Sequence, residues 1–147
     1  MKKLLLVAIL ALGAYYVGQT HKTPTIAPTA TAEAIQDGSA LLQAAYQNQQ
    51  SDLQVQGAGQ VSRILPDDNK GSRHQKFLLR LATGQTILIA HNIDLAQRIG
   101  GLQEGDTVEF FGEYEWNDKG GVVHWTHHDP GGRHTDGWLK HNGTLYQ

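Results

Sequence analysis

An alternation of apolar residues with other residues, which starts after Asp52, restricts the fold of this chain more than any other feature. The first run covers 53–61, where Gly57 and Gly59 occupy two of the alternating positions and indicate a bend or bulge. Four further runs follow turn-forming clusters, at 77–81, 86–90, 108–116 and 122–127. Because successive side chains of a strand point to opposite faces, these runs predict five short strands of a mainly β domain.

The segment between the third and fourth runs predicts a short helix. Residues 93–99, with the sequence IDLAQRI, could be capped by Asn92 or Asp94 and ended by Gly100. Three strands, a short helix and two strands form the chain order of the OB-fold, a Greek-key barrel that binds oligonucleotides or oligosaccharides. We therefore expect a small five-stranded OB-like barrel. An SH3-like barrel and an open five-stranded sheet with a helix are the alternatives.

The region before the strands divides into three parts. Residues 1–18 combine a Lys-Lys start with an apolar stretch of about fifteen residues, which indicates a signal peptide or an N-terminal anchor. Residues 19–32 are rich in Thr, Pro and Ala and predict a linker, and 33–50 have the apolar spacing of one helix. Residues 53–147 then form a single His-rich domain. We expect an exported monomer, either free in the periplasm or anchored in the inner membrane facing it.

Composition excludes several classes of function. The chain contains no cysteine, which excludes disulfides, zinc–thiolate sites and thiol catalysis. Its formal net charge is −2, whereas a protein that binds nucleic acid chiefly through charge is more basic. The sequence also lacks the phosphate-binding GxxxxGKS/T, the nucleophile GxSxG and the zinc-binding HExxH motifs.

The histidines are concentrated near the C-terminus, where five of the eight lie between His124 and His141. Neutral imidazole is the commonest protein ligand for transition metals, and a mixed set of His and carboxylates suits one divalent ion such as Zn or Mn. A metal-free acid/base site and purely structural histidines are the alternatives. The candidate metal ligands are His124, His127, His128, Glu113 and His134.

The geometry of this cluster depends on the last two predicted strands. If 122–128 is extended, His124 and His128 share one face but lie too far apart to hold an ion alone. On the fourth strand Glu113 and Glu115 share a face that Tyr114 does not. A four-residue hairpin loop would pair Glu113 with His124, and a five-residue loop would pair Tyr114 with it.

A basic segment, KGSRHQK at 70–76, lies between the first two predicted strands. In an OB-fold this loop contacts the ligand, and Gly, Ser, Arg, His and Lys all favour anion binding. The alternative for this basic segment is a mobile hairpin tip. For 91–92 the alternative is an Asn cap beside a partly buried His, and for Trp125 it is a place in the core. The candidate substrate-binding residues are Lys70, Ser72, Lys76, His91, Asn92 and Trp125. The candidate catalytic residues are His124, His128, Asp129, Arg73 and His74.

Four segments form a specific combination: LPDDNKGSRHQKF, LIAHNIDLA, GDTVEFFGEYEWNDKGGVVHWTHHDPGGRH and GWLKHNG. In this combination the chain resembles an uncharacterised family of small exported bacterial proteins, known only as a domain of unknown function. The resemblance covers Leu53 to Tyr146. It implies that the domain begins at Leu53 and that the leader is variable, and it implies no activity.

Three functions remain open. The first is a metal-dependent phosphodiesterase or nuclease-like hydrolase, in which the metal polarises the phosphate or activates water. The second is a non-catalytic OB-like module that binds nucleic acid, glycan or another ligand of the cell envelope. The third is a periplasmic carrier of metal or haem, tethered to the membrane by its N-terminus.

Overall fold

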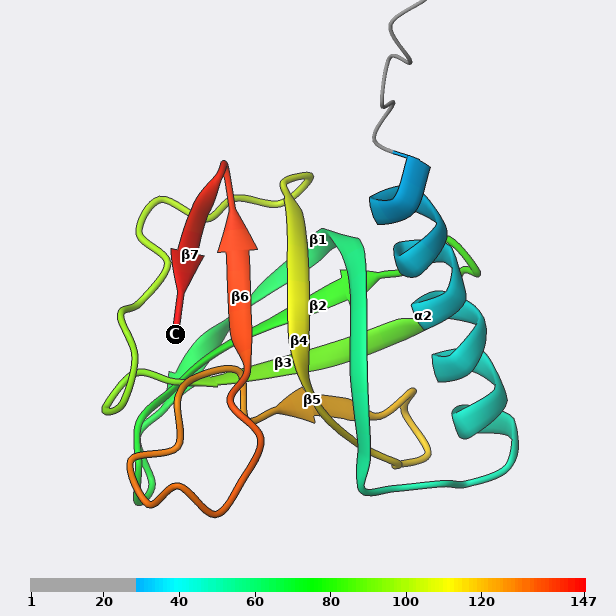
Figure 1. Cartoon of the computed structure of the whole chain (residues 1–147). Coiled ribbons are helices and arrows are strands. Elements are labelled where there is room, and N and C mark those ends of the chain that lie inside the picture. The colour runs from blue at the N-terminus through cyan, green and yellow to red at the C-terminus, as the bar shows by residue number, and fades with distance from the viewer. Residues whose placement is uncertain (1–28) are drawn as a thin grey trace, which may run out of the picture.

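The computed structural model describes residues 29–147, and side chains from Gly38 onward. The expected signal peptide or anchor at 1–18 and most of the expected linker lie outside these residues. Within them, one helix precedes seven strands (Figure 1). The elements are α2 (Thr29–Gln47), β1 (Leu53–Asp68), β2 (His74–Arg80), β3 (Thr86–Asn92), β4 (Thr107–Glu115), β5 (Val122–His124), β6 (Trp138–His141) and β7 (Thr144–Tyr146).

Five of the strands make a partly closed ring. Their order is β1-β2-β3-β5-β4, and β4 returns to pair with β1. All neighbours are antiparallel except β3 and β5, which are parallel. This confirms the mainly β class and the OB-like strand order expected from the sequence.

The length and bending of β1 close the ring. Its first half, from Leu53, pairs with β4, and its second half, from Gln60, pairs with β2. A Cβ at Gly57 would lie 2.7 Å from the Phe110 ring, and one at Gly59 would lie 2.8 Å from a backbone oxygen. The glycines expected to mark a bend are therefore positions where β1 passes close to its neighbours.

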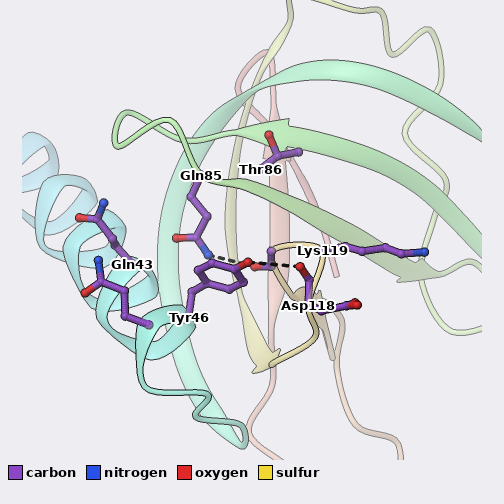
Figure 2. A pocket seen from close by; sticks show the side chains of 8 residues that line it. Gln43, Tyr46, Gln85, Thr86, Asp118 and Lys119 are labelled. Carbon is purple, nitrogen blue, oxygen red and sulfur yellow. Dashed lines mark hydrogen bonds between the residues drawn. The ribbon is translucent and has the colours of Figure 1, made fainter.

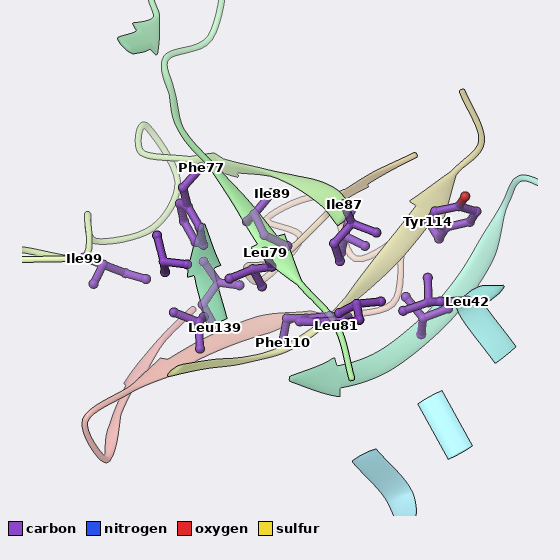
Figure 3. Close-up of a cluster of buried hydrophobic side chains, with 14 of the residues drawn as sticks. Leu42, Phe77, Leu79, Leu81, Ile87, Ile89, Ile99, Phe110, Tyr114 and Leu139 are labelled. Carbon is purple, nitrogen blue, oxygen red and sulfur yellow. The ribbon is translucent and has the colours of Figure 1, made fainter. Parts of the chain in front are cut away.

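The inward side chains of the ring form the hydrophobic core (Figure 3). Alternate residues of β2 and β3 are buried, so that Phe77, Leu79, Ile87 and Ile89 have no exposed surface. The residues between them lie on the outer face of the ring and are half-buried. Any chemistry carried by these strands is therefore presented on the outer face.

Helix α2 packs against β1 and the β4–β5 hairpin (Figure 1). Leu42 and Ala45 are fully buried, and a Cβ at Gly38 would overlap the carbonyl oxygen of Gln56. This glycine, which weakens an isolated helix, is thus required for close packing on the strand. Within residues 29–147, no helix combines the length and the apolar character needed to cross a membrane.

The short helix predicted at 93–99 is wrong, because residues 93–95 form one turn and 96–99 have no regular secondary structure. The side-chain oxygen of Asn92 accepts a hydrogen bond from the N–H of Asp94, and its backbone oxygen accepts one from the N–H of Ala96. These two bonds close a single turn. The chain then leaves the helical path because Gln75 holds Ile99 through two hydrogen bonds, of 2.9 and 3.1 Å. A tertiary contact therefore replaces the next helical turn.

The C-terminal part also differs from the expectation. Strand β5 ends at His124 instead of continuing to residue 127, because Trp125 has a φ of 53°, which a bulky residue seldom adopts. The tail then adds β6 beside β4 and β7 beside β6. Asn142 and Gly143, both with positive φ, form the two-residue turn between them.

Candidate functional site

The β4–β5 hairpin brings two carboxylates and an imidazole together on the outer face. Glu113 pairs with His124, which is the first of the two expected registers, and residues 116–121 connect the two strands. The Nε2 atom of His124 lies 3.6 Å from Oε1 of Glu113 and 3.8 Å from Oε1 of Glu115. One ligand atom from each of these three residues lies within 4.8 Å of the others.

The charge of this group favours a cation. Burial lowers the pKa of His124, against the influence of Glu113, and therefore favours the neutral imidazole that metals bind. Burial, together with the charges of Asp52 and Glu113, raises the pKa of Glu115. Among the described residues, Nε2 of His124 is buried without a hydrogen-bond partner. A neutral nitrogen thus faces two carboxylates that repel each other.

The spacing of these atoms fits a metal ion. Two ligand atoms held about 2.1 Å from zinc at tetrahedral angles lie roughly 3.4 Å apart. The separations of 3.6 and 3.8 Å from the His124 nitrogen to the two carboxylates are close to this value. Glu113, Glu115 and His124 could therefore hold a divalent metal after small side-chain movements, and we call them the metal triad.

His134 contacts the metal triad through Glu113. Its Nε2 lies 2.6 Å from Oε2 of Glu113, and its Nδ1 lies 2.8 Å from the carbonyl oxygen of Thr135. Partial desolvation lowers the pKa of His134, but the hydrogen bonds to Glu113 and Thr135 and the charges of Glu113 and Asp129 together outweigh it, so the net pKa is raised. The ring also stacks on Trp125, with centroids 4.1 Å apart and planes 7° apart. His134 thus orients one carboxylate of the triad.

An open pocket of about 350 Å³ adjoins the metal triad on the outer face. His74 and Lys76 of β2 line one side together with Asp68 of β1, and Glu115 and His124 line the other. Lys76 pairs with Ala90 of β3, and the β3–β5 register places Ala90 level with His124. Since neighbouring strands lie about 4.8 Å apart, the backbones of Lys76 and His124 are roughly 10 Å apart. The short side chain of Ala90 leaves the hollow between them.

The rest of the basic segment does not line this pocket. Arg73 binds Asp94 through its side chain and its backbone N–H, each at 2.7 Å. The carbonyl oxygen of Ser72 accepts a hydrogen bond from His74, and the N–H of Lys70 donates to Asp68. Of the expected loop residues, the structure therefore places only His74 and Lys76 beside the metal triad.

His91 and Asn92 have structural roles, because their side chains make hydrogen bonds within the fold. His91 is fully buried, with Nδ1 2.8 Å from Oγ1 of Thr126 and Nε2 3.1 Å from the carbonyl oxygen of Gln97. Burial lowers its pKa to about 4, so its ring is neutral. Asn92 caps the turn that follows β3. Neither lines the pocket beside the triad.

The remaining expected residues lie in or next to the turn that carries His134. Asp129 accepts the N–H groups of Gly131, Arg133 and His134, which lowers its pKa. His128 lies 3.0 Å from a carboxylate oxygen of Asp136. His127 is nearly buried and lies 5.5 Å from Trp125 between ring centroids. None of these residues belongs to the metal triad.

The whole described region matches one protein-family model. The match covers residues 25–147, and the description of the family is Protein of unknown function (DUF3465). The chain belongs to this family. The expected resemblance to a domain of unknown function is thereby confirmed, and the match begins before the expected Leu53, at residue 25. No curated protein matches the chain. Since family membership brings no activity with it, the function of the DUF3465 domain must be argued from the site.

Two residues of this DUF3465 site were absent from the expected set. Glu115 shares the outer face of β4 with Glu113, which the alternation already indicated, but it was not among the expected ligands. Ala90 has no reactive group, and its importance comes from the space above it. Only the register between β2, β3 and β5 reveals this space.

Proposed function

We propose that the protein is a metal-dependent phosphodiester hydrolase whose metal triad binds one divalent transition metal. The observation that carries the proposal is one pocket lined by Glu115 and His124 of the metal triad and by Lys76 and His74 of β2, with Asp68 beside the latter two. An anion bound there would meet the metal on one side and an ammonium group on the other. Carboxylate and imidazole ligands together suit zinc or manganese.

The reaction follows from these two charges. A divalent metal held by Glu113, Glu115 and His124 would supply Lewis acidity, which would polarise a phosphate oxygen and make water easier to deprotonate. In the proposed hydrolysis a water oxygen would form a bond to phosphorus, one P–O ester bond would break, and a proton of that water would pass to the leaving alkoxide. Lys76 stabilises the negative charge on the non-bridging oxygens. Neither glutamate needs to be a nucleophile, because water supplies the attacking oxygen.

The experiment is a cleavage assay on purified protein, using bis(p-nitrophenyl) phosphate and a single-stranded oligonucleotide with zinc or manganese. Cleavage is expected to stop on addition of EDTA. Glu115→Gln and His124→Asn are expected to lower kcat/KM by at least about 100-fold, since metal polarisation contributes several kcal/mol. His128→Asn is the control, because this exposed histidine pairs with Asp136 outside the triad. Cleavage that persists in EDTA would refute the proposal.

Non-catalytic binding of an anionic ligand is the second candidate, and the positions of Lys76 and His74 favour it. Their attraction for an anion does not depend on a metal. This function predicts oligonucleotide binding that survives EDTA and is lost in Lys76→Ala, without turnover. Tight metal uptake without ligand binding or turnover would instead support a metal carrier.

We also propose that the protein acts outside the cytoplasm. The support is the Lys-Lys start followed by the apolar stretch within residues 1–18. Fractionation of expressing bacteria, with mass spectrometry of the N-terminus, tests this proposal. Periplasmic or inner-membrane protein is expected, and recovery in the cytoplasm with residues 1–18 intact would contradict it.

A further inference from the structure

A second pocket lies away from the metal triad, between the end of α2 and two turns of the sheet (Figure 2). Its volume is about 410 Å³. The helix contributes Gln43 and Tyr46, the β2–β3 turn contributes Gln85, and the β4–β5 hairpin contributes Asp118 and Lys119. None of these residues lines the pocket beside the metal triad.

The walls of this second pocket are tied together by hydrogen bonds. The hydroxyl of Tyr46 donates to the carbonyl oxygen of Asp118 at 3.2 Å, and Nε2 of Gln85 donates to that of Gly120 at 2.9 Å (Figure 2). The indole N–H of Trp116 also donates to the carbonyl oxygen of Tyr46, at 3.1 Å. Three chain segments are therefore held in place before any ligand arrives, which lowers the entropic cost of binding.

Close backbone packing supports the same conclusion. Gly120 has a φ of 116°, and a Cβ there would overlap the carbonyl oxygen of Thr86. Only glycine allows the hairpin to approach the start of β3 this closely. The floor of the pocket is thus set by the backbone rather than by mobile side chains.

The lining matches a ligand rich in hydroxyl groups. Each glutamine amide offers donors and an acceptor, and a sugar hydroxyl is likewise both. Among the described residues, the buried Oε1 of Gln85 has no hydrogen-bond partner, so a small rotation of this side chain would present an unsatisfied acceptor to the pocket. The ring of Tyr46 adds an apolar surface for C–H groups. Asp118 and Lys119 carry opposite charges, so the pocket favours a neutral ligand.

We propose that this second pocket, which we call the amide pocket, binds a neutral saccharide of one or two rings. A volume of about 410 Å³ lies in the lower part of the range for small-molecule sites, roughly 300–1,000 Å³. A pocket of this size can hold a short saccharide, but it is too small to enclose a long oligosaccharide along its whole length. The site is independent of the metal triad and of any hydrolytic activity.

The test is a chemical-shift titration of the nitrogen-labelled full protein with neutral mono- and disaccharides of glucose, galactose and N-acetylglucosamine, in EDTA. For at least one sugar, saturable shifts are expected at the side-chain amides of Gln43 and Gln85 and at the backbone N–H of Lys119. Gln43→Ala should weaken binding about fivefold, since one hydrogen bond contributes about 1 kcal/mol. Gln43 is exposed, so this variant is expected to fold.

Gln50→Ala is the matched control, because Gln50 is also exposed but lies outside the amide pocket. Its affinity should equal that of the unchanged protein. Three results would overturn the proposal: the absence of saturable shifts with every sugar, shifts centred on His74 and His124, or tighter binding of glucuronate than of glucose. The last result would show that charge, and not the amide lining, selects the ligand.

Discussion

Ala90 defines the pocket beside the metal triad by the smallness of its side chain. It lies between Lys76 and His124 on the outer face, where each neighbour carries a charged or metal-binding group. A larger residue here would keep a ligand from reaching both groups at once. The core below is unaffected, because Ala90 is only half-buried and points outward.

Ala90→Leu is therefore expected to separate metal binding from phosphate binding. Metal affinity should stay within about twofold, while kcat/KM for bis(p-nitrophenyl) phosphate should fall at least about tenfold, which corresponds to about 1.4 kcal/mol. Metal titration calorimetry and the cleavage assay measure the two quantities. Ala58→Leu, on the half-exposed face of β1, is the control. An Ala90→Leu protein with full activity would show that the ligand binds elsewhere.

His91 makes the stability of the protein depend on pH. Burial lowers its pKa to about 4, below the value of about 6.5 in an unfolded chain. Between these pH values the unfolded state binds a proton that the folded state does not. The free energy of unfolding therefore falls as the pH drops from 6.5 to 4, by about 3 kcal/mol from this residue.

The prediction is tested by urea denaturation of the unchanged protein and of His91→Leu across this pH range. The variant is expected to be less stable at pH 7, because the hydroxyl of Thr126 loses its partner. Its disadvantage should shrink as the pH falls, since it no longer has this imidazole to protonate. If the free energies of unfolding of the two proteins changed with pH in parallel, His91 would not titrate as the structure indicates.

The β4–β5 hairpin is the element that assembles the metal triad. Gly121 has a φ of 95°, and a Cβ there would overlap the ring of Tyr114, which is fully buried. This close approach holds the hairpin in the register that pairs Glu113 with His124. A slip of one residue would turn His124 to the other face.

Gly121→Ala should therefore lower the free energy of unfolding by about 2–5 kcal/mol, from backbone strain together with overpacking. It should also weaken metal binding, since the triad loses its register. Gly84→Ala is the matched control, because Gly84 has a φ of 86° but no heavy atom within 4 Å of the place that a Cβ would occupy. Its cost is expected to be about 1–2 kcal/mol. Equal losses in both variants would contradict the role of the Tyr114 contact.

The strands of the ring could be predicted from the sequence because their alternation is local. The helix at 93–99 could not be excluded, since Gln75, which interrupts it, is distant in the chain. The β6–β7 hairpin was missed although Asn142 and Gly143 are a strong turn signal. Its flanking strands, of four and three residues, are too short to alternate clearly.

The candidate site was predictable only in part. The composition of the His-rich segment led to Glu113, His124 and His134, and the basic segment led to Lys76. The hairpin register, which decides between Glu113 and Tyr114, depends on loop length and was open. The burial of His91 was one of the alternatives expected at 91–92, and it continues the inward alternation of Ile87 and Ile89.

At the scale of the whole molecule, the net charge of −2 limits how a polyanion can bind. Only two basic side chains on β2, His74 and Lys76, line the pocket beside the metal triad in the described part of the chain. Long-range electrostatic attraction between the protein and a polyanion is therefore weak, and the affinity for such a ligand must come from contacts in the pocket itself.

Oligonucleotide binding should accordingly depend little on salt. With at most two phosphates neutralised, the slope of log K against log salt concentration should be no steeper than about −1.4 for a single strand. Fluorescence anisotropy of a labelled oligonucleotide, measured in a calcium-free buffer with manganese, gives this slope. A slope steeper than about −4 would require a basic surface that the described residues do not contain.

Our central proposal is that Glu113, Glu115 and His124 form one metal site. Anomalous scattering from crystals soaked in zinc, recorded at the zinc edge, tests it most directly. We predict a peak about 2.0–2.2 Å from Nε2 of His124 and from a carboxylate oxygen of each glutamate. A peak confined to His128 and Asp136, or the absence of any peak at the triad, would contradict it.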